Sequence, residues 1–432
     1  MKMRNFLIIC LVGGAAALST GCAEQKPVSV SASSASQFAE ASTSADSPIR
    51  QAEIMVERAP DSPIAYAVLS AAYIKSARET GDFALNARAE AAARRALELD
   101  PSNLAAQKLD ASLHLTFHRF AEALEAGKKL QRDNPRDPFV YGVLTDANIE
   151  LGNYREAVEA GQTMVDLRPN MESYARVALL RSLYGESAGA IEAMSLAARV
   201  ADPQDREAQS WCLAHLGEEY FKIGKFADAE KQYDAALQIL PNYHLALAGK
   251  AKARAAQGDL DAAIKFYAEA QNRVPLVETV IALGDLYAKK GEAEKAKAQY
   301  DLAEIMEQKF GGEDKRRLAL LWADRDTRLD EALTIAAQEK ANRRDIYTAD
   351  VYAWARYKKG KFSEAQAAID EAMKLKTKDA RIFYHAGMIA KALGNAKEAK
   401  RYLNLAIETN PAFDLLQAEK ARAALKEMMN AE

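Results

Sequence analysis

Apolar side chains along the chain recur in paired segments that share one order of small and large residues. The clearest pair carries Leu213, Leu216, Gly217, Tyr220, Phe226, Ala229, Tyr233 and Ala236. Small residues such as Ala229 would let two helices approach to about 8–10 Å between their axes, while large ones such as Tyr233 would fill the gaps. Gly224 separates the two segments, because a turn with positive φ suits glycine. Pro241 follows the second segment and cannot continue a helix. The pattern predicts two packed helices joined by a short turn.

The same pair of segments repeats with a fixed period. Proline recurs every 34 residues at positions 101, 135, 169 and 203, again from 241 to 275, and after four further periods at 411. Glycine marks the turn inside seven of these periods, at Gly152, Gly185, Gly224, Gly258, Gly291, Gly360 and Gly394. A period of this length is the signature of a stacked helix-turn-helix array. Because one repeat cannot cover its own apolar face, its stability would come from its neighbours.

Several copies of the pattern resemble the tetratricopeptide repeat (TPR). In that family the first helix carries an aromatic residue or Leu, then Leu-Gly and Tyr, and the second carries Ala, an aromatic residue, Ala and a closing Pro. Besides the copy at 213–241, the resemblance rests on copies at 141–169, 247–275, 283–303 and 383–411. It covers nearly all of the chain from Ser62 to Pro411, which is about ten repeats. The resemblance implies an all-α fold, an α-solenoid wound as a right-handed superhelix. Its concave face would come from the first helix of each repeat, helix A.

The ends and irregularities of the array suggest its boundaries. A capping helix that opens at Ser47-Pro48 is expected over 47–61, repeats one to seven over 62–310, and repeats eight to ten over 311–411. An amphipathic C-terminal capping helix is expected over 412–432. Gly311-Gly312 breaks the helix of the seventh repeat, and the next repeat matches the pattern poorly. The break is either a hinge between two stacks or a repeat that packs badly.

The start of the chain predicts export. Lys2 and Arg4 precede an apolar run over 6–18 that is too short to span a bilayer, and small residues follow it. Leu18-Ser19-Thr20-Gly21-Cys22 resembles a bacterial lipobox, although its Leu lies one place earlier than usual. The alternative interpretation is an ordinary secretory signal cleaved after Gly21-Cys22-Ala23.

The lipobox resemblance implies a lipoprotein signal peptide over 1–21 and lipidation of Cys22. Ala23 resembles the signal for sorting to the outer membrane, which would place the protein at the cell envelope, facing the periplasm. Residues 22–46 are rich in Ser and Ala and predict a flexible tether. Because Cys10 would leave with the signal and Cys22 would be lipidated, Cys212 would be the one free thiol. We expect its side chain to pack in a helix as a small apolar residue.

Composition narrows the function classes. The 21 Gly and 12 Pro are scarce, which favours helices over many short strands. The net charge of -3 offers no strong basic field that would hold nucleic acid. No apolar run reaches the roughly 18 residues that a membrane span needs. A lipid anchor is therefore the expected contact with the membrane.

Candidate chemistry is sparse. His114 and His118 lie at i and i+4 on one helix face, but no third metal ligand is obvious nearby. The sequence contains no phosphate loop, Gly-x-Ser-x-Gly motif or Rossmann fingerprint. Carboxylates are expected on solvated helix faces. The prediction is a protein that is not an enzyme, with no catalytic residue, metal or cofactor.

Aromatic residues on helices A are the candidate partner-binding groove. They lie between the packing positions and comprise Trp211, Phe221, Tyr347, Trp354, Tyr357, Tyr384 and Met388. Aromatic side chains in a concave groove anchor peptides well. The alternative is that these rings pack between repeats.

The leading hypothesis is a non-enzymatic scaffold or adaptor of the bacterial cell envelope that binds a protein or peptide partner in its groove. One alternative is a structural spacer that associates with itself. Another is an accessory subunit of a secretion or polysaccharide assembly. An enzyme with accessory repeats is the weakest hypothesis, because no segment is left over to fold as a catalytic domain.

Overall fold

The computed structural model describes residues 47–310 and 315–430. The predicted signal peptide and tether, with Cys22, lie outside the described residues, and so does the predicted break at Gly311-Gly312. The chain divides between Asp133 and Asn134 into two compact units. The N-terminal unit is described over 47–133, and the C-terminal unit over 134–310 and 315–430.

Five helices lie within residues 47–133 of the N-terminal unit. They are α2 (Pro48–Arg58), α3 (Pro63–Thr80), α4 (Leu85–Leu99), α5 (Leu104–Thr116) and α6 (Phe120–Asp133). Helix α2 begins as the sequence predicts, because Ser47 Oγ accepts a hydrogen bond from the backbone N–H of Arg50 at 3.1 Å and Pro48 occupies the first turn. Tyr73 and the small residue Ala52 are both buried, in one cluster.

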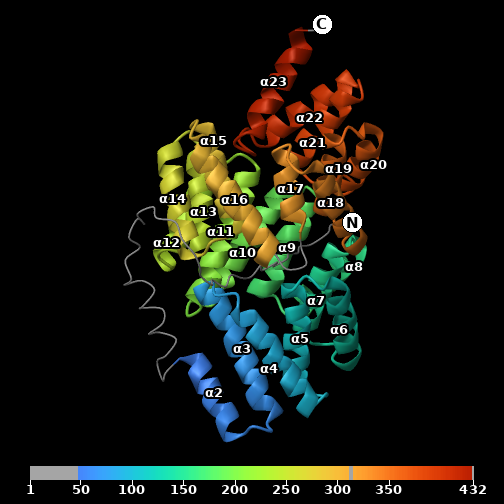
Figure 1. The fold of residues 1–432 in the computed structure, drawn as a ribbon. Coiled ribbons are helices and arrows are strands. Elements are labelled where there is room, and N and C mark those ends of the chain that lie inside the picture. Colours follow the sequence, from blue (N-terminus) through green and yellow to red (C-terminus); the bar gives the residue numbers. More distant parts are fainter. Residues whose placement is uncertain (1–46, 311–314, 431–432) are drawn as a thin grey trace. The chain divides into compact units, whose positions relative to one another are not determined.

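The C-terminal unit continues the same alternation of helices (Figure 1). Its helices are α7 (Pro138–Glu150), α8 (Tyr154–Leu167), α9 (Met171–Leu183), α10 (Ser187–Val200), α11 (Arg206–Lys222), α12 (Phe226–Ile239), α13 (His244–Ala256), α14 (Leu260–Arg273), α15 (Val277–Lys289), α16 (Ala293–Phe310), α17 (Arg316–Asp324), α18 (Leu329–Asn342), α19 (Ile346–Lys358), α20 (Phe362–Ala372), α21 (Ala380–Ala392), α22 (Ala396–Thr409) and α23 (Gln417–Asn430).

Helices α3 to α22 of the described residues form ten consecutive pairs, and α23 follows the last pair. The described part of the chain contains no β-strand. The expected all-α architecture is therefore confirmed. The odd-numbered helices from α3 to α21 are the helices A of the sequence pattern.

Glycines let the large side chains of the pattern enter between helices. Tyr233 on α12 is buried against both α11 and α13. A Cβ atom at Gly217 would lie 2.5 Å from the Tyr233 ring, and one at Gly249 would lie 2.2 Å from it. Both distances are too short for a real side chain. The Leu216-Gly217 motif is thus required by the ring that packs on it.

Three successive turns of the C-terminal unit meet three helix ends that lie far along the chain. Thr377 Oγ1, after α20, donates a hydrogen bond to the carbonyl of Leu183 at the end of α9, 194 residues away. Asn410 Nδ2, after α22, donates to the carbonyl of Phe221 at 2.9 Å across 189 residues. Arg343, after α18, pairs with Glu150 at the end of α7 across 193 residues. The chain therefore returns upon itself within this unit.

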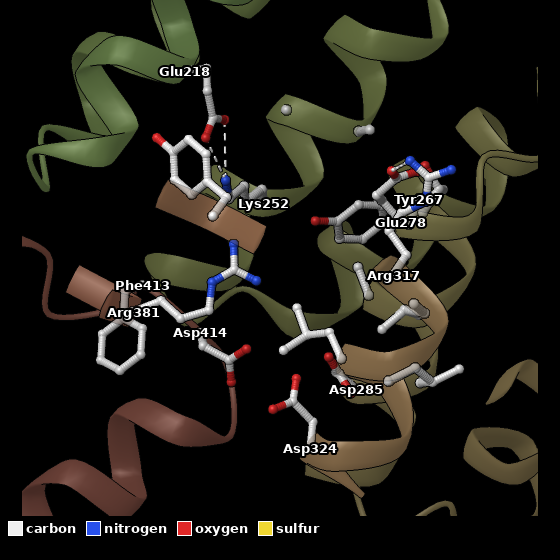
Figure 2. A pocket seen from close by; sticks show the side chains of 18 of the residues that line it. Glu218, Lys252, Tyr267, Glu278, Asp285, Arg317, Asp324, Arg381, Phe413 and Asp414 are labelled. Atoms are coloured by element: carbon white, nitrogen blue, oxygen red, sulfur yellow. Dashed lines mark hydrogen bonds and ion pairs between the residues drawn. The ribbon is translucent and has the colours of Figure 1, made fainter. Parts of the chain in front are cut away.

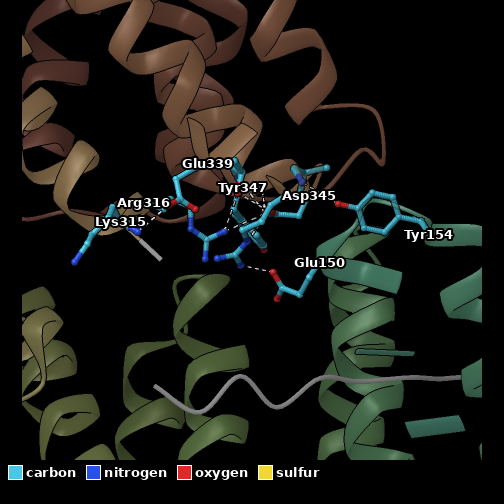
Figure 3. Close-up of polar contacts among 10 residues, drawn as sticks. Glu150, Tyr154, Lys315, Arg316, Glu339, Asp345 and Tyr347 are labelled. Carbon is cyan, nitrogen blue, oxygen red and sulfur yellow. Dashed lines mark hydrogen bonds and ion pairs between the residues drawn. The ribbon is translucent and has the colours of Figure 1, made fainter. Parts of the chain in front are cut away.

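A buried polar network surrounds the contact between Arg343 and Glu150 (Figure 3). The Tyr154 hydroxyl accepts a hydrogen bond from the backbone N–H of Ile346 at 2.8 Å. Asp345, the residue before Ile346, accepts a hydrogen bond from Arg316 at 3.1 Å. These bonds join the turn between α7 and α8 to α17 and α19. Because an isolated buried charge is costly, the paired arrangement holds these helices in one register.

Replacing Gly152 by Ala should disturb this contact more than an equal change elsewhere. Gly152 has φ +74°, and a Cβ there would lie 2.4 Å from the carbonyl oxygen of Arg344. Gly291 has φ +77°, with nothing within 4 Å of its Cβ position. Both substitutions carry the penalty of a left-handed conformation, about 1 kcal/mol, and the clash adds roughly 1–3 kcal/mol only at Gly152. Urea unfolding should show Gly152→Ala as clearly the less stable variant. Equal losses of stability would contradict the contact.

Candidate functional site

A cavity of about 600 Å³ lies inside the C-terminal unit. Most of its wall comes from helices A, namely α11, α13, α15, α17, α19 and α21, and Phe413 and Asp414 add to it from the segment before α23 (Figure 2). Helices A were expected to form the concave face, and they face this cavity. The volume falls in the range of pockets that hold small molecules or short peptide segments.

The wall of the cavity is charged with both signs. Its acidic residues are Glu218, Glu278, Asp285, Asp324, Asp350 and Asp414. Its basic residues are Lys252, Arg316, Arg317, Arg325 and Arg381. The two sets nearly balance. The expectation that carboxylates lie on solvated helix faces is therefore wrong for Asp285 and Asp350, which are buried, whereas Glu278 is exposed.

Most of the basic residues are paired. Lys252 Nζ lies 2.8 Å from Glu218 Oε1, and Arg317 Nη1 lies 3.1 Å from Glu278 Oε1. Arg317 also contacts Glu307, a fully buried carboxylate on α16, at 2.7 Å. Such pairs satisfy charges that would otherwise be expensive to enclose.

Asp285 is a carboxylate of the wall whose pKa is shifted. It pairs with Arg325 and accepts a hydrogen bond from the Tyr300 hydroxyl at 2.7 Å. Burial nevertheless raises the pKa of Asp285 to about 7, and the charges of Asp414 and Asp324 contribute to the rise while Arg325 opposes it. Burial is thus the main reason why Asp285 holds its proton more tightly, despite its basic partner.

Asp324 and Asp414 accept hydrogen bonds only from neutral groups among the described residues. Asp324 Oδ1 accepts from Trp354 Nε1 at 2.8 Å and from Gln417 Nε2 at 2.6 Å. Asp414 Oδ1 accepts from the backbone N–H groups of Leu416 and Gln417 at 2.8 and 2.7 Å. Burial, followed by the charge of Asp414, raises the pKa of Asp324. The two carboxylates are therefore close enough to repel each other.

Arg381 projects from α21 into the cavity, as Figure 2 shows. Its guanidinium makes no hydrogen bond or ion pair with any residue that the structure describes. Burial lowers the pKa of Arg381, but the charges of Asp379, Asp350, Asp324 and Asp414 outweigh this effect and raise it. The guanidinium is thus firmly charged and open to a ligand.

The aromatic residues predicted to line a groove mostly lie behind the cavity wall. Tyr347 on α19 does line the cavity. Trp211, Phe221, Trp354 and Tyr384 are each at most 6% exposed, and Tyr357 and Met388 pack partly buried in the cluster of Trp354 and Tyr384. For the four buried rings the prediction of an open binding surface is wrong, because neighbouring repeats and the segment at Phe413 cover them.

These buried rings support the residues of the wall. Trp354 donates its indole N–H to Asp324, and the Tyr357 ring stacks on Trp354 with centroids 4.8 Å apart. The Trp211 ring packs 4.0 Å from that of His215, and burial lowers the pKa of His215 to about 4. The ammonium of Lys252 lies 4.2 Å from the centre of the Phe221 ring. Stiff aromatic rings therefore hold the charged lining in place.

The charged lining itself was not predicted. One signal in the sequence could have indicated part of it, because Glu218 and Asp285 each directly follow the Leu-Gly pair of a helix A. That position points inward in both repeats. Asp324, Arg381 and Asp414 share no common place in the repeat, so the period alone carries no sign of them.

The other candidate residues have structural surroundings. His114 Nε2 lies 3.3 Å from Asp110 Oδ2 on the same helix, and no group of three possible metal ligands occurs within 47–310 or 315–430. Cys212 is fully buried, as its packing interpretation predicts, and burial raises the pKa of the thiol to about 12. Among the helices that the structure describes, none is long and apolar enough to cross a bilayer.

Comparison with known proteins identifies the repeat. A family model described as "Tetratricopeptide repeat" matches residues 74–138 and 215–276, and a second model with the same description matches 380–413. A comparison with curated proteins finds no match. Together with the ten helix pairs, these matches show an all-α tetratricopeptide-repeat solenoid.

Solved structures with a similar fold have low sequence identity. A tetratricopeptide repeat protein from Parabacteroides merdae is 21% identical, covers 65% of this chain and 100% of its own, and has a TM-score of 0.36. PilW, a type IV pilus biogenesis factor, is 18% identical over 48% of this chain and 92% of its own, with a TM-score of 0.38. A human IFIT1 dimer with PPP-AAAA is 14% identical over 84% and 94%, with a TM-score of 0.46. These likenesses concern the fold alone.

Replacing Asp285 by Asn should change how stability depends on pH. The folded pKa of about 7 lies above the ordinary value of 3.8, so the folded state holds this proton more tightly than the unfolded state. Wild-type stability therefore falls as the pH rises from about 4 to about 7, and the variant lacks this contribution. Urea unfolding should be measured at about pH 5 and about pH 8. Between these two pH values, the free energy of unfolding of the variant should rise by roughly 2 kcal/mol relative to that of the wild type. The matched control is Asp261→Asn, whose side chain is 85% exposed, and it should follow the wild type. An Asp285→Asn curve parallel to the wild-type curve would contradict the raised pKa.

Proposed function

We propose that this protein is a non-enzymatic TPR scaffold or adaptor of the bacterial cell envelope that binds a protein or peptide partner in the cavity of its C-terminal unit. The observation that carries the proposal is the cavity of about 600 Å³ walled by helices A, with the unpaired charges of Arg381, Asp324 and Asp414 turned into it. Unpaired charges in a partly enclosed space cost stability, so a ligand that pairs with them is the simplest reason for their presence.

A protein partner fits this wall better than a nucleic acid. Six carboxylates and five basic groups line the cavity, so its field does not favour a chain of phosphates. Peptides offer charges of both signs together with backbone donors and acceptors. The nearly balanced lining of the cavity therefore supports a peptide segment as the ligand.

We further propose that the protein is anchored to the membrane through lipidated Cys22, with residues 22–46 as a flexible tether. The support is the signal-like start of the chain and its lipobox-like sequence ending at Cys22. Buried acyl chains contribute about 0.8 kcal/mol per methylene group and would hold the scaffold at the cell envelope. The proposed site is the outer membrane, with the scaffold facing the periplasm.

Filling the cavity should weaken partner binding without unfolding the protein. Ala282 on α15 lines the cavity, so Ala282→Phe places a bulky ring in it, whereas Ala298 on α16 is exposed on the outside. Partners should be identified by proximity labelling in the native organism and then measured with purified components. Ala282→Phe should weaken binding by about tenfold or more, which corresponds to about 1.4 kcal/mol, and Ala298→Phe should not. Equal affinities for the two variants would refute binding in the cavity.

Removing Cys22 should release the protein from the membrane. In cells fed a fatty-acid analogue, the wild type should carry the label and sediment with membranes. Cys22→Ala should be unlabelled and soluble, because no acyl chain is attached. Cys212→Ala is the control that removes a buried thiol and should keep the label. A wild-type protein without label would instead support the ordinary secretory signal.

A further inference from the structure

Unpaired charges of opposite sign face the same cavity. Lys252, Arg317 and Arg325 each have a carboxylate partner in the wall, whereas Arg381 has no such partner among the described residues. Asp324 and Asp414 likewise make no ion pair among these residues. The paired residues therefore stabilise the wall, and the unpaired ones are left for something that enters the cavity.

In the view of Figure 2 the two carboxylates lie below the Arg381 guanidinium, and they come from separate elements. Asp324 ends α17, and Asp414 lies between α22 and α23. Trp354 and Gln417 orient Asp324, while backbone N–H groups orient Asp414, so neither carboxylate is free to swing. Fixed orientation is what a specific polar site needs, since little rotamer entropy is lost when a ligand binds.

We infer that the cavity binds a short peptide with free ends, whose carboxylate pairs with Arg381 and whose ammonium group pairs with Asp324 and Asp414. The inference rests on the proposed function, because it names the ligand chemistry of the same cavity. A guanidinium offers two parallel N–H donors that match a carboxylate. An ammonium group carries three donors, enough to reach two carboxylates.

A ligand with charge of only one sign suits the site less well. A lone carboxylate at Arg381 would face the nearby charges of Asp350, Asp324 and Asp414, and a lone ammonium group would face Arg381. A zwitterion satisfies both sets at once and adds no net charge to the enclosed space. The volume of about 600 Å³ leaves room for a chain of more than one residue.

The test is calorimetry of the full chain with alanine peptides of two, three and four residues. For the length that binds best, the peptide is compared with its N-acetylated and its C-amidated form. Each modification removes one charge while keeping the backbone. Each should weaken binding by about tenfold or more, as expected for loss of a charged hydrogen-bonded pair.

Two protein variants assign each end of the peptide to its partner. Arg381→Gln should weaken binding of the free peptide. In this variant amidation should no longer lower the affinity, whereas acetylation should still lower it. Asp414→Asn keeps a side-chain oxygen for the backbone N–H groups and should show the reverse pattern. Arg401→Gln is the matched control, since Arg401 lies on α22 outside the cavity and pairs with Glu398.

The results separate this inference from the proposed function. If acetylation and amidation leave the affinity of wild type unchanged, or if none of the peptides binds, the inference is overturned. If the Ala282→Phe substitution nevertheless weakens binding of the protein partner, the proposed function stands. Because the modified peptides are tested on the wild type, a variant that misfolds does not prevent a decision.

Discussion

The contact between the ends of the early helices α7, α9 and α11 and the turns after the late helices α18, α20 and α22 is the constraint on which the rest of the C-terminal unit depends. Arg343 and Glu150 form a buried ion pair within it, with side-chain exposures of 5% and 10%. Thr377 and Asn410 repeat the same contact one and two helix pairs further on. Because the chain is fixed upon itself at three successive places, helices A from α11 to α21 line one shared cavity.

Enclosure changes what the side chains on helices A can do. On an open concave surface the charges would be hydrated and weakly coupled, whereas in a cavity they interact strongly. The raised pKa of Asp285, at about 7, is caused first by burial, which outweighs the opposing charge of Arg325, and the carboxylates of Asp414 and Asp324 add to it. Aromatic rings behind the wall, such as Trp354, hold the polar groups in fixed directions. The cavity is therefore a polar site built on a stiff apolar layer.

Sequence reasoning predicted the helix pairs well and the site only in part. Gly217 and Tyr233 take the packing roles that the repeat pattern predicts. Tyr347 is the one predicted groove aromatic that lines the cavity. Trp354 is on the predicted helix, but the segment before α23 helps to cover it, and a 34-residue period carries no information about a segment outside the repeats. Asp414 belongs to that same segment, which is why it was missed.

The turn glycines separate what the sequence by itself determined from what only the tertiary structure decided. The repeat places a glycine in each turn because the backbone there has positive φ, and Gly152 and Gly291 have nearly the same value, +74° and +77°. The local conformation was therefore readable from the sequence. Gly152 additionally lies under the carbonyl of Arg344, whereas Gly291 has open space around it. This difference depends on how several stacked repeats curve and bring distant residues together. The sequence of a single repeat carries no information about that curvature.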